Sequence, residues 1–367
     1  MSSAAVVFGG PAPEHDISIL TGLQACRALL DAGQDVDALY WAKSGAWFSV
    51  PADLEALAFA DGVPSGAGAV TLVAGPEGGF VAEGRFGRRS AVGTDVVVNC
   101  CHGGPGEDGS LQGAFDIAGV RYTGPSAAAA ALGMDKLAFG AAVRDAGLPS
   151  LPRLLLTTDG AKPDFDGPYI VKPRYGGSSI GIETVEDVDT AMALARSSTH
   201  LADGAVVEPF RPDAVDLNIA IRSWPELELS PIERPLTKGE GRIWGYADKY
   251  MGGGGMATAP RELPADIPDE LADRIRHTGR AVAELTVVRG VARLDFLRDG
   301  DELYVNEINT IPGSLAWPLW AHAGVALDRL LLDMIDEARQ RPSRTFSTEG
   351  ADGTALRAAG SIAGKLA

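Results

Sequence analysis

One stretch near the C-terminal end, residues 291–314, constrains the fold of this chain most strongly; it reads VARLDFLRDGDELYVNEINTIPGS. VARLDFL and ELYVNEIN both have the apolar content of a strand. The Asp-Gly pair between them is typical of a tight turn that joins two antiparallel strands. The sequence therefore predicts a hairpin here.

Polar side chains alternate with apolar ones along both predicted strands. Because successive side chains of a strand point to opposite faces, Arg293 and Asp295 are expected to share one face. On the return strand, Glu307 and Asn309 are expected to share a face with Val305. The hairpin can thus bring together three oxygen-bearing side chains, which suit Mg²⁺, and a guanidinium that suits a phosphoryl group or an oxyanion.

A simpler interpretation is that these polar residues form a solvated face on which Arg293 pairs with Asp295. Their apolar neighbours disfavour it, because those neighbours need burial and would carry the acids inside with them. Partly buried carboxylates require a cation or a tight hydrogen-bond network. The hairpin therefore predicts either a cation site or a tight network of polar side chains.

Composition and charge exclude several partners. The chain has 367 residues, enough for two or three domains, and its net charge of −17 disfavours nucleic acid and anionic membranes. A nucleotide stays compatible, because a few local cations suffice to bind it. The three cysteines lack metal-binding spacing, and neither a signal peptide nor a membrane-spanning apolar run is evident. These features predict a cytoplasmic protein.

The first part of the chain alternates strand-like and helix-like runs, which predicts an open parallel sheet. Ala4–Gly10 is a strand pattern, and the polar loop after it contains Glu14; taken alone, this segment favours a simple helix cap at Asp16 or Ser18 over a ligand site. Residues 64–90 predict a β-ribbon or an insertion. The glycine-rich run at 102–109 follows a buried strand, where α/β sheets bind ligands, but Glu107 is also explained by a helix N-terminus.

A second glycine-rich loop, Tyr175–Ile180, follows the strand pattern YIVKP. Such a loop exposes N–H groups and hydroxyls that can cover phosphates, although it is not a Walker A loop. Lys172 lies just before this loop, within reach of the same phosphates. The alternative is that Lys172 is an exposed strand lysine, but its apolar neighbours disfavour that interpretation. Two further strands within 204–222 bear Glu208 and Asp216, and an adenosine could lie between them.

The remaining segments are less informative by themselves. Tyr246–Gly255 is a third glycine-rich loop and contains Lys249 and Tyr250. An amphipathic helix is predicted over Asp269–Leu285, directly before the hairpin. From residue 340 onward the composition predicts a loosely held tail.

Taken together, these segments resemble the D-alanine–D-alanine ligase family of the ATP-grasp superfamily. The matching segments follow the family's order over most of residues 4–340: EHDIS, HGGPGEDGSLQG, YTG, MDK, VKPRYGGSSIGI, VVEPF, YADKY, ARLDF and NEINTIPG. The resemblance implies an ATP-grasp fold of α/β and α+β domains. It implies an N-terminal open-sheet domain at 1–124, central and C-terminal domains at 125–210 and 211–340 that clasp ATP, and a tail at 341–367.

The same resemblance implies the reaction. The enzyme would use ATP and two Mg²⁺ ions, or Mn²⁺, to activate one amino acid as an acyl phosphate and join it to the amine of another; a homodimer is compatible. The resemblance implies that Glu14 binds the amine of the first amino acid, that Tyr250 borders the substrate and that Arg293 stabilises the tetrahedral intermediate. It implies that Lys136, Lys172 and Lys249 contact phosphates, that Ser178 and Ser179 lie in the phosphate-covering loop, and that Glu208 and Asp216 (usually Glu in the family) contact adenine and ribose. Asp295, Glu307 and Asn309 would bind Mg²⁺.

One departure from the family concerns the second substrate. The predicted site of the second substrate begins at Gly313 and Ser314. In the family, the sequence after this point contains a Ser-Leu pair that binds the carboxylate of the second D-alanine. This chain has Pro318 and Leu319 there, and proline offers neither a hydroxyl nor an N–H group. Flanking tryptophans, among them Trp320, add apolar bulk. Three hypotheses stay open: a D-alanine–D-alanine ligase with a rearranged acceptor site, a related ligase of specialised metabolism with another acceptor, and a non-catalytic nucleotide-binding protein.

Overall fold

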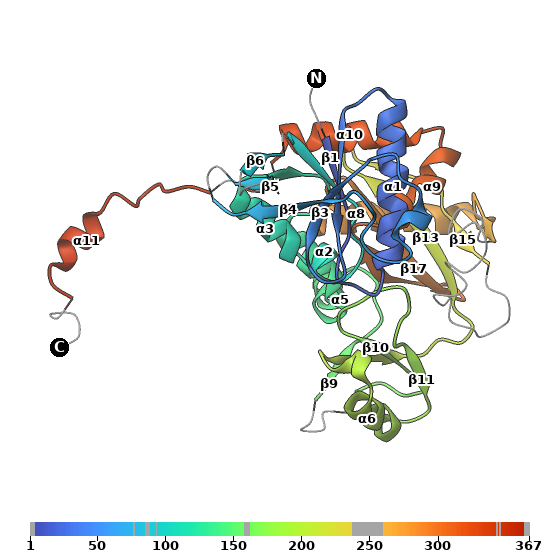
Figure 1. Ribbon diagram of the computed structural model, residues 1–367. Coiled ribbons are helices and arrows are strands. Elements are labelled where there is room, and N and C mark those ends of the chain that lie inside the picture. Colours follow the sequence, from blue (N-terminus) through green and yellow to red (C-terminus); the bar gives the residue numbers. More distant parts are fainter. Residues whose placement is uncertain are drawn as a thin grey trace.

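A computed structural model gives the structure of the chain over residues 4–362, except 76–77, 85–88, 93, 158–161, 237–259, 343 and 345. In this part of the chain the strands form sheets of eight, four, four and two strands. Figure 1 shows the eight-stranded sheet beside α1 and α10, with the sheet that contains β9, β10 and β11 at the opposite end of the molecule. No helix in the described ranges is long and apolar enough to cross a membrane.

The eight-stranded sheet is mixed, with the order β6-β5-β4-β3-β2-β1-β7-β8. Only β2, β1, β7 and β8 are parallel, so the predicted open parallel sheet is correct for half of the strands. The predicted ribbon at residues 64–90 belongs to the other half, in which successive strands pair antiparallel. The strands are β1 (Ala4–Gly9), β2 (Val36–Trp41), β3 (Trp47–Val50), β4 (Gly68–Val73), β5 (Gly79–Glu83), β6 (Arg89–Ala91), β7 (Val96–Asn99) and β8 (Arg121–Tyr122).

Helices cover both faces of this sheet. β1 is buried on both sides: Val6 and Phe8 face one hydrophobic cluster, and Ala5 and Val7 face the other. The first cluster includes α10, so the C-terminal end of the fold returns to the N-terminal sheet. The helices around the sheet are α1 (His15–Asp31), η1 (Ala56–Phe59), α2 (Gly104–Glu107), α3 (Ser110–Ala118) and α10 (Leu327–Gln340).

The central sheet is small and antiparallel, with the order β11-β10-β12-β9. One of its faces packs against α6 through Val171, Val207 and Ala191. The end of β10 leads directly into the predicted phosphate loop. Its elements are β9 (Leu154–Leu156), β10 (Tyr169–Pro173), β11 (Glu183–Val185), α6 (Val188–Ser197), η3 (Thr199–Leu201) and β12 (Ala205–Pro209).

The third sheet contains the predicted hairpin, and its order is β14-β13-β17-β18. Phe139 and Val143 of α5 pack into its core, so this helix lies with the third sheet although the predicted division groups it with the central domain. The boundaries of that division stay a prediction. The elements are α4 (Ala127–Met134), α5 (Lys136–Asp145), β13 (Val215–Arg222), β14 (Glu228–Leu229), β15 (Arg234–Pro235), β16 (Arg261–Glu262), α8 (Asp269–Leu285), β17 (Val291–Asp299), β18 (Glu302–Asn309), η5 (Gly313–Ala316) and α9 (Trp317–His322).

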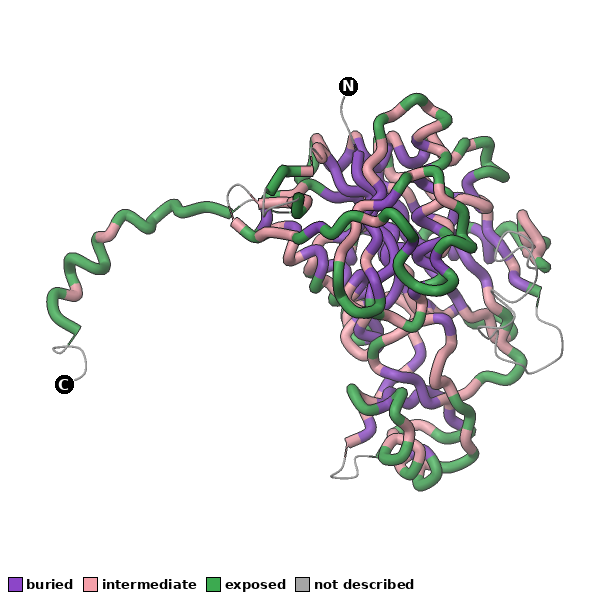
Figure 2. The backbone as a smooth tube through the Cα atoms, in the orientation of Figure 1, coloured by how far each residue is buried: buried purple, intermediate pink, exposed green. Residues whose placement is uncertain are grey.

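The C-terminal segment leaves the body of the protein. Figure 1 shows α11 (Thr354–Ala359) at the end of an extended stretch, and no residue of this helix is buried. Figure 2 shows buried residues concentrated in the sheets and exposed ones along this segment. The prediction of a loosely held tail over 341–367 stays a prediction.

Candidate active site

The hairpin brings its four predicted residues together. Asp295 lies opposite Glu307, and Arg293 lies opposite Asn309. The Arg293 guanidinium donates two hydrogen bonds of 2.7 Å to the Asp295 carboxylate, and the Asn309 amide donates a third of 3.1 Å to it. Both members of the Arg293–Asp295 pair are buried. The simpler interpretation is thus correct about the pair but wrong about a solvated face.

A β-bulge changes which side chains reach this face. Phe296 pairs with Val305 while Asp295 pairs with Glu307, so Asn306 is an additional residue in β18. Val305 therefore packs in the hydrophobic core, and the prediction that it shares a face with Glu307 is wrong. The Asn306 side chain instead accepts a hydrogen bond of 3.1 Å from Lys172. Two consecutive polar residues after an apolar pair were the signal for this bulge.

Lys172 is held by a buried ion-pair cluster. Its ammonium lies 2.8 Å from Glu208, whose other carboxylate oxygen lies 2.9 Å from the Nε atom of Arg153. Arg153 also donates to the backbone carbonyls of Lys136 and Asn306. Burial acts to raise the pKa of Glu208, but the charges of Lys172 and Arg153 outweigh it and lower that pKa. Glu208 is thus tied to two cations, and no sequence pattern singled out Arg153.

A cleft of about 720 Å³ opens above this cluster, within the range of small-ligand sites. Asp295 and Glu307 line it together with Lys136 and Lys172. Burial lowers the pKa of the Lys136 ammonium. The Glu307 carboxylate, 4.0 Å away, opposes this shift because its negative charge favours the protonated lysine. Asp216 and Ser179 also line the cleft, as predicted for contacts to a nucleotide.

The donor set of the cleft fits Mg²⁺ and a phosphate chain. Asp295 and Glu307 are cross-strand neighbours with oxygen ligands, and the buried lysines supply the charges that phosphates need. Among the described residues, no group of three or more His, Cys, Asp or Glu side chains is arranged to hold a metal ion. The predicted set is two carboxylates and the Asn309 amide, so substrate oxygens or waters would complete the shell.

The loop Tyr175–Ile180 joins the N-terminal and central parts at Glu14. Ser178 donates a hydrogen bond to the Glu14 carboxylate, whereas Ser179 faces the cleft. The two serines, predicted to act together on phosphates, therefore face different groups. The side chain of Glu14 also lies close to Gly103, where a Cβ atom would come within 2.3 Å of it. Any larger residue at Gly103 would displace this carboxylate.

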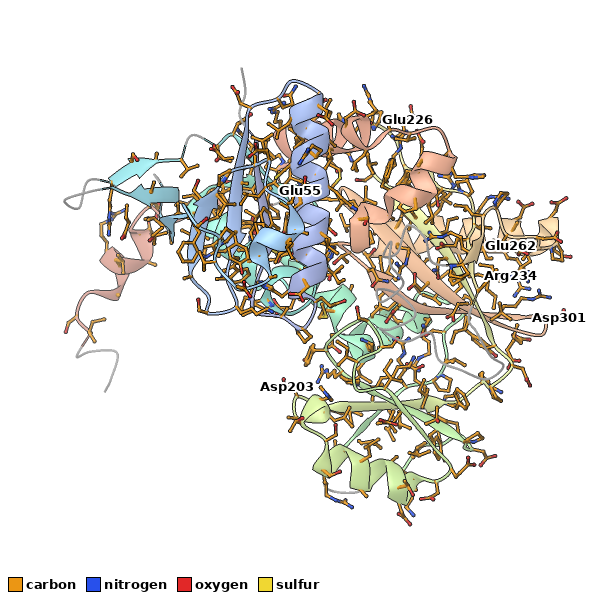
Figure 3. The ribbon with its side chains drawn as sticks, turned by 45° about the vertical axis from the view of Figure 1, so that its right-hand side comes forward. Glu55, Asp203, Glu226, Arg234, Glu262 and Asp301 are labelled. Carbon is orange, nitrogen blue, oxygen red and sulfur yellow. The ribbon has the colours of Figure 1, made fainter. Side chains whose placement is uncertain are left out.

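Two predicted residues, Lys249 and Tyr250, lie in 237–259, outside the described part of the chain. The two ends of this segment leave from the ribbon of β15 and β16. Figure 3 shows Arg234 and Glu262 of the ribbon close together, and their ion pair measures 2.7 Å. The cleft-lining Pro235 belongs to the same ribbon.

The predicted acceptor residues form a distinct segment after the hairpin. Ser314, Leu315 and Ala316 all have positive φ, between 49° and 52°. Pro318 lies in the first turn of α9. Leu319 and Trp320 are buried in the N-terminal hydrophobic core, so the prediction that this tryptophan flanks the acceptor is wrong. Gly313, Ser314, Pro318 and Leu319 do not line the main cleft.

Two buried titratable groups connect this segment to the N-terminal part. Glu107 accepts hydrogen bonds from Gly103 and Ile311 backbone N–H groups, at 3.0 and 2.9 Å. Burial and the nearby charge of Glu14 raise the pKa of Glu107 to about 7. His102 contacts the carbonyl of Ile311 at 2.7 Å, and burial lowers its pKa to about 4. The simpler explanation, that Glu107 only complements a helix N-terminus, does not account for its hydrogen bond to Ile311.

Comparisons with known proteins agree with this geometry. Residues 3–125 match the model of the D-ala D-ala ligase N-terminus, and residues 157–336 match that of the D-ala D-ala ligase C-terminus. A D-alanine--D-alanine ligase from Mycolicibacterium gilvum is 32% identical, over 92% of this chain and 97% of the relative. One from Bradyrhizobium sp. is 29% identical, over 93% and 96%.

Solved structures show the same fold. The D-alanine-D-alanine ligase from Coxiella burnetii has a TM-score of 0.74 at 22% identity, over 93% of this chain and 94% of that one. The VanG D-Ala:D-Ser ligase from Enterococcus faecalis has a TM-score of 0.71 at 22% identity, over 92% and 99%. The predicted ATP-grasp fold is thus confirmed. The chain belongs to the D-alanine–D-alanine ligase family of ATP-dependent, ADP-forming, peptide-bond-forming enzymes.

Proposed function

We propose that this enzyme transfers the γ-phosphoryl group of ATP to the carboxylate of a first amino acid and couples the resulting acyl phosphate to the amine of a second. The observation that supports this proposal most strongly is the cleft itself. Lys136 and Lys172 face it together with the cross-strand carboxylates Asp295 and Glu307. Lysines that contact phosphates and carboxylates that hold Mg²⁺ are the groups that a metal–triphosphate site requires.

Each side chain then has a definite task. Lys136 and Lys172 bind phosphate oxygens, while Asp295, Glu307 and Asn309 hold two Mg²⁺ ions. The ions would spread the negative charge of phosphoryl transfer. The Arg293 guanidinium, oriented by its two hydrogen bonds to Asp295, is suited to stabilise the oxyanion formed when the amine attacks.

The first amino acid binds where the N-terminal part meets the phosphate loop. The Glu14 carboxylate attracts its ammonium group, and Ser178 fixes the orientation of that carboxylate. Acyl phosphates hydrolyse readily, so the loop Tyr175–Ile180 has to exclude water. Lys249 and Tyr250, outside the described residues, are assigned to the γ-phosphate and to the substrate border by the family resemblance alone.

An isotope experiment tests the acyl phosphate. During coupling, one oxygen of the donor carboxylate leaves with phosphate. A first amino acid labelled with ¹⁸O in its carboxylate should therefore yield one ¹⁸O atom per inorganic phosphate, detected by mass spectrometry. Unlabelled phosphate together with dipeptide would exclude this route. ADP release without any amide product would exclude ligase activity.

One observation favours an acceptor other than D-alanine. Pro318 lies in the first turn of α9, at the position of the family's carboxylate-binding serine, and it has no donor group. Because Leu319 and Trp320 pack in the core, the difference is confined to Pro318 and the half-buried Trp317. We propose that the acceptor is bulkier or less acidic than D-alanine. A cytoplasmic location and a homodimer stay predictions, the former supported by three buried free cysteines.

A further inference from the structure

The acceptor segment, residues 310–316, is fastened to the N-terminal part by side chains far away in sequence. Glu107 accepts from the Ile311 N–H group, and His102 contacts the Ile311 carbonyl. Thr21, on α1, accepts a hydrogen bond of 3.1 Å from the Ser314 N–H group. The backbone of the segment is thus held on both sides of Pro312 by the N-terminal part.

The chemistry of His102 fixes the direction of these hydrogen bonds. Its Nδ1 atom lies 2.7 Å from a carbonyl oxygen, which can only accept, so Nδ1 carries the proton. Burial lowers the pKa of His102 to about 4, so the ring is neutral and Nε2 is an acceptor. The Thr21 hydroxyl, 2.8 Å away, therefore donates to Nε2 and keeps its lone pairs for Ser314. Thr21 acts as an oriented acceptor and not as a freely rotating hydroxyl.

The segment needs such a restraint. Ser314, Leu315 and Ala316 occupy the left-handed region, with φ of 49°, 52° and 51°, and none of them is glycine. Each such residue is strained relative to a right-handed conformation, because its Cβ atom approaches the following carbonyl oxygen. Three in succession persist only where the surroundings hold them. The Thr21–Ser314 hydrogen bond acts on the first of the three.

We propose that Thr21 is a positioning residue for the second substrate: through its hydrogen bond to Ser314 it holds the left-handed run that leads into Pro318. This inference rests on the proposed function and adds a residue that touches neither substrate nor nucleotide. Loss of the hydrogen bond would let Ser314 leave its left-handed conformation, and the acceptor site would no longer be held in one geometry. The donor and nucleotide contacts at Glu14, Lys136 and Lys172 do not involve Thr21.

The test compares T21V, which keeps the shape and removes the acceptor oxygen, with T21S, which keeps the oxygen. T286V is the matched control, because Thr286 is also buried and its hydroxyl donates to the Val282 carbonyl at the C-terminal end of α8. ADP release is measured with an amino acid acceptor and with hydroxylamine, a small acceptor without a carboxylate. Backbone hydrogen exchange at residues 314–316 is measured on the free proteins.

T21V should raise the KM of the amino acid acceptor by about tenfold, the effect of one lost hydrogen bond. Its KM for ATP and the donor, and its turnover with hydroxylamine, should stay within about twofold of those of the wild type. Exchange at residues 314–316 should accelerate in T21V but not in T21S or T286V. If T21V does not fold, T21A serves in the same assays with the same expectations.

Unchanged exchange at 314–316 in T21V would overturn the inference, as would equal losses for donor, acceptor and ATP. Equal effects of T286V on the acceptor KM would also overturn it, because they would reveal a general loss of stability. A wild-type enzyme that releases no ADP with any amine refutes the proposed function instead. In that case the exchange experiment still decides whether Thr21 holds the segment.

Discussion

The guanidinium of Arg153 lies 2.9 Å from the carboxylate of Glu208, and each side chain is only 1% exposed. Glu208 in turn binds Lys172, so one buried anion orients two cations beneath the cleft. Through its other nitrogens, Arg153 reaches the backbone of Lys136 and Asn306. A single residue thus connects α5, the central sheet and the bulge of β18.

Removal of this guanidinium should destabilise the protein. R153M leaves Glu208 with one cation and removes two hydrogen bonds to backbone carbonyls, so the free energy of unfolding should fall by about 3 kcal/mol. The control is R27M, because Arg27 pairs with Glu55 on the surface at 51% and 83% side-chain exposure; its cost should stay below about 1 kcal/mol. Urea denaturation measures both. Equal losses would contradict a structural role for the buried cluster.

The metal assignment predicts a selective loss in E307Q. This change removes one unit of charge from the proposed Mg²⁺ site but keeps the shape, so phosphoryl transfer should fall sharply at limiting Mg²⁺ while the fold persists. E302Q provides the control, because Glu302 is exposed at the start of the same strand. ADP release is titrated against Mg²⁺ for each variant. Near-normal turnover of E307Q at limiting Mg²⁺ would refute the assignment.

The buried carboxyl of Glu107 should make stability depend on pH. Burial first, and then Glu14, raise its folded pKa to about 7 from 4.5, so the folded state binds the proton more tightly than the unfolded state. Its contribution is therefore complete below about pH 4.5 and is lost as the pH rises through 7. His102, with a pKa lowered to about 4, acts in the opposite direction between pH 4 and 6.5.

A comparison between E107Q and the wild type isolates the Glu107 contribution, because His102 is present in both. The wild type should lose stability relative to E107Q between pH 5 and 8, by up to about 3 kcal/mol. Thermal unfolding across this range measures the difference. A constant difference between the two proteins at every pH would show that Glu107 does not titrate there.

Local sequence patterns were sufficient for the hairpin. Alternation and an Asp-Gly turn predicted that Asp295, Glu307 and Asn309 meet, and they do. The bulge at Asn306 was missed, although the adjacent polar residues Asn306 and Glu307 interrupt the alternation; one additional residue reverses the face of every residue beyond it. The prediction of a parallel sheet was correct for only half of the strands. The helical connections between the parallel strands were evident in the sequence, but the antiparallel pairing of the other strands was not.

Residues whose partners are distant in sequence escaped prediction. Arg153 and Thr21 stand in ordinary apolar surroundings, and only the folded chain reveals that they bind Glu208 and Ser314. Conversely, the composition around Pro318 suggested two tryptophans in the acceptor site, but Trp320 is buried in the core. The family resemblance predicts which residues take part in the reaction, whereas the contacts of Arg153 and Thr21 required the structure.

The absence of a donor at Pro318 predicts weak binding of D-alanine as the second substrate. A carboxylate that loses one charge-assisted hydrogen bond loses about 1.5–3 kcal/mol. This corresponds to roughly tenfold to more than a hundredfold weaker binding. Formation of the acyl phosphate should be unaffected, because the contacts of Glu14, Lys136 and Lys172 do not involve Pro318. P318S should improve the use of D-alanine.

Acceptor choice is tested most directly by kcat/KM for amine-dependent ADP release, with D-alanine alone and with a panel of bulkier D- and L-amino acids and amines. The products are identified by mass spectrometry. We expect an amide product with a panel member at higher kcat/KM than with D-alanine alone. If D-alanine alone yields D-alanyl-D-alanine and nothing on the panel exceeds it, Pro318 is a neutral replacement and the altered acceptor is refuted. If no amine yields an amide product, the proposed ligase activity is refuted as well.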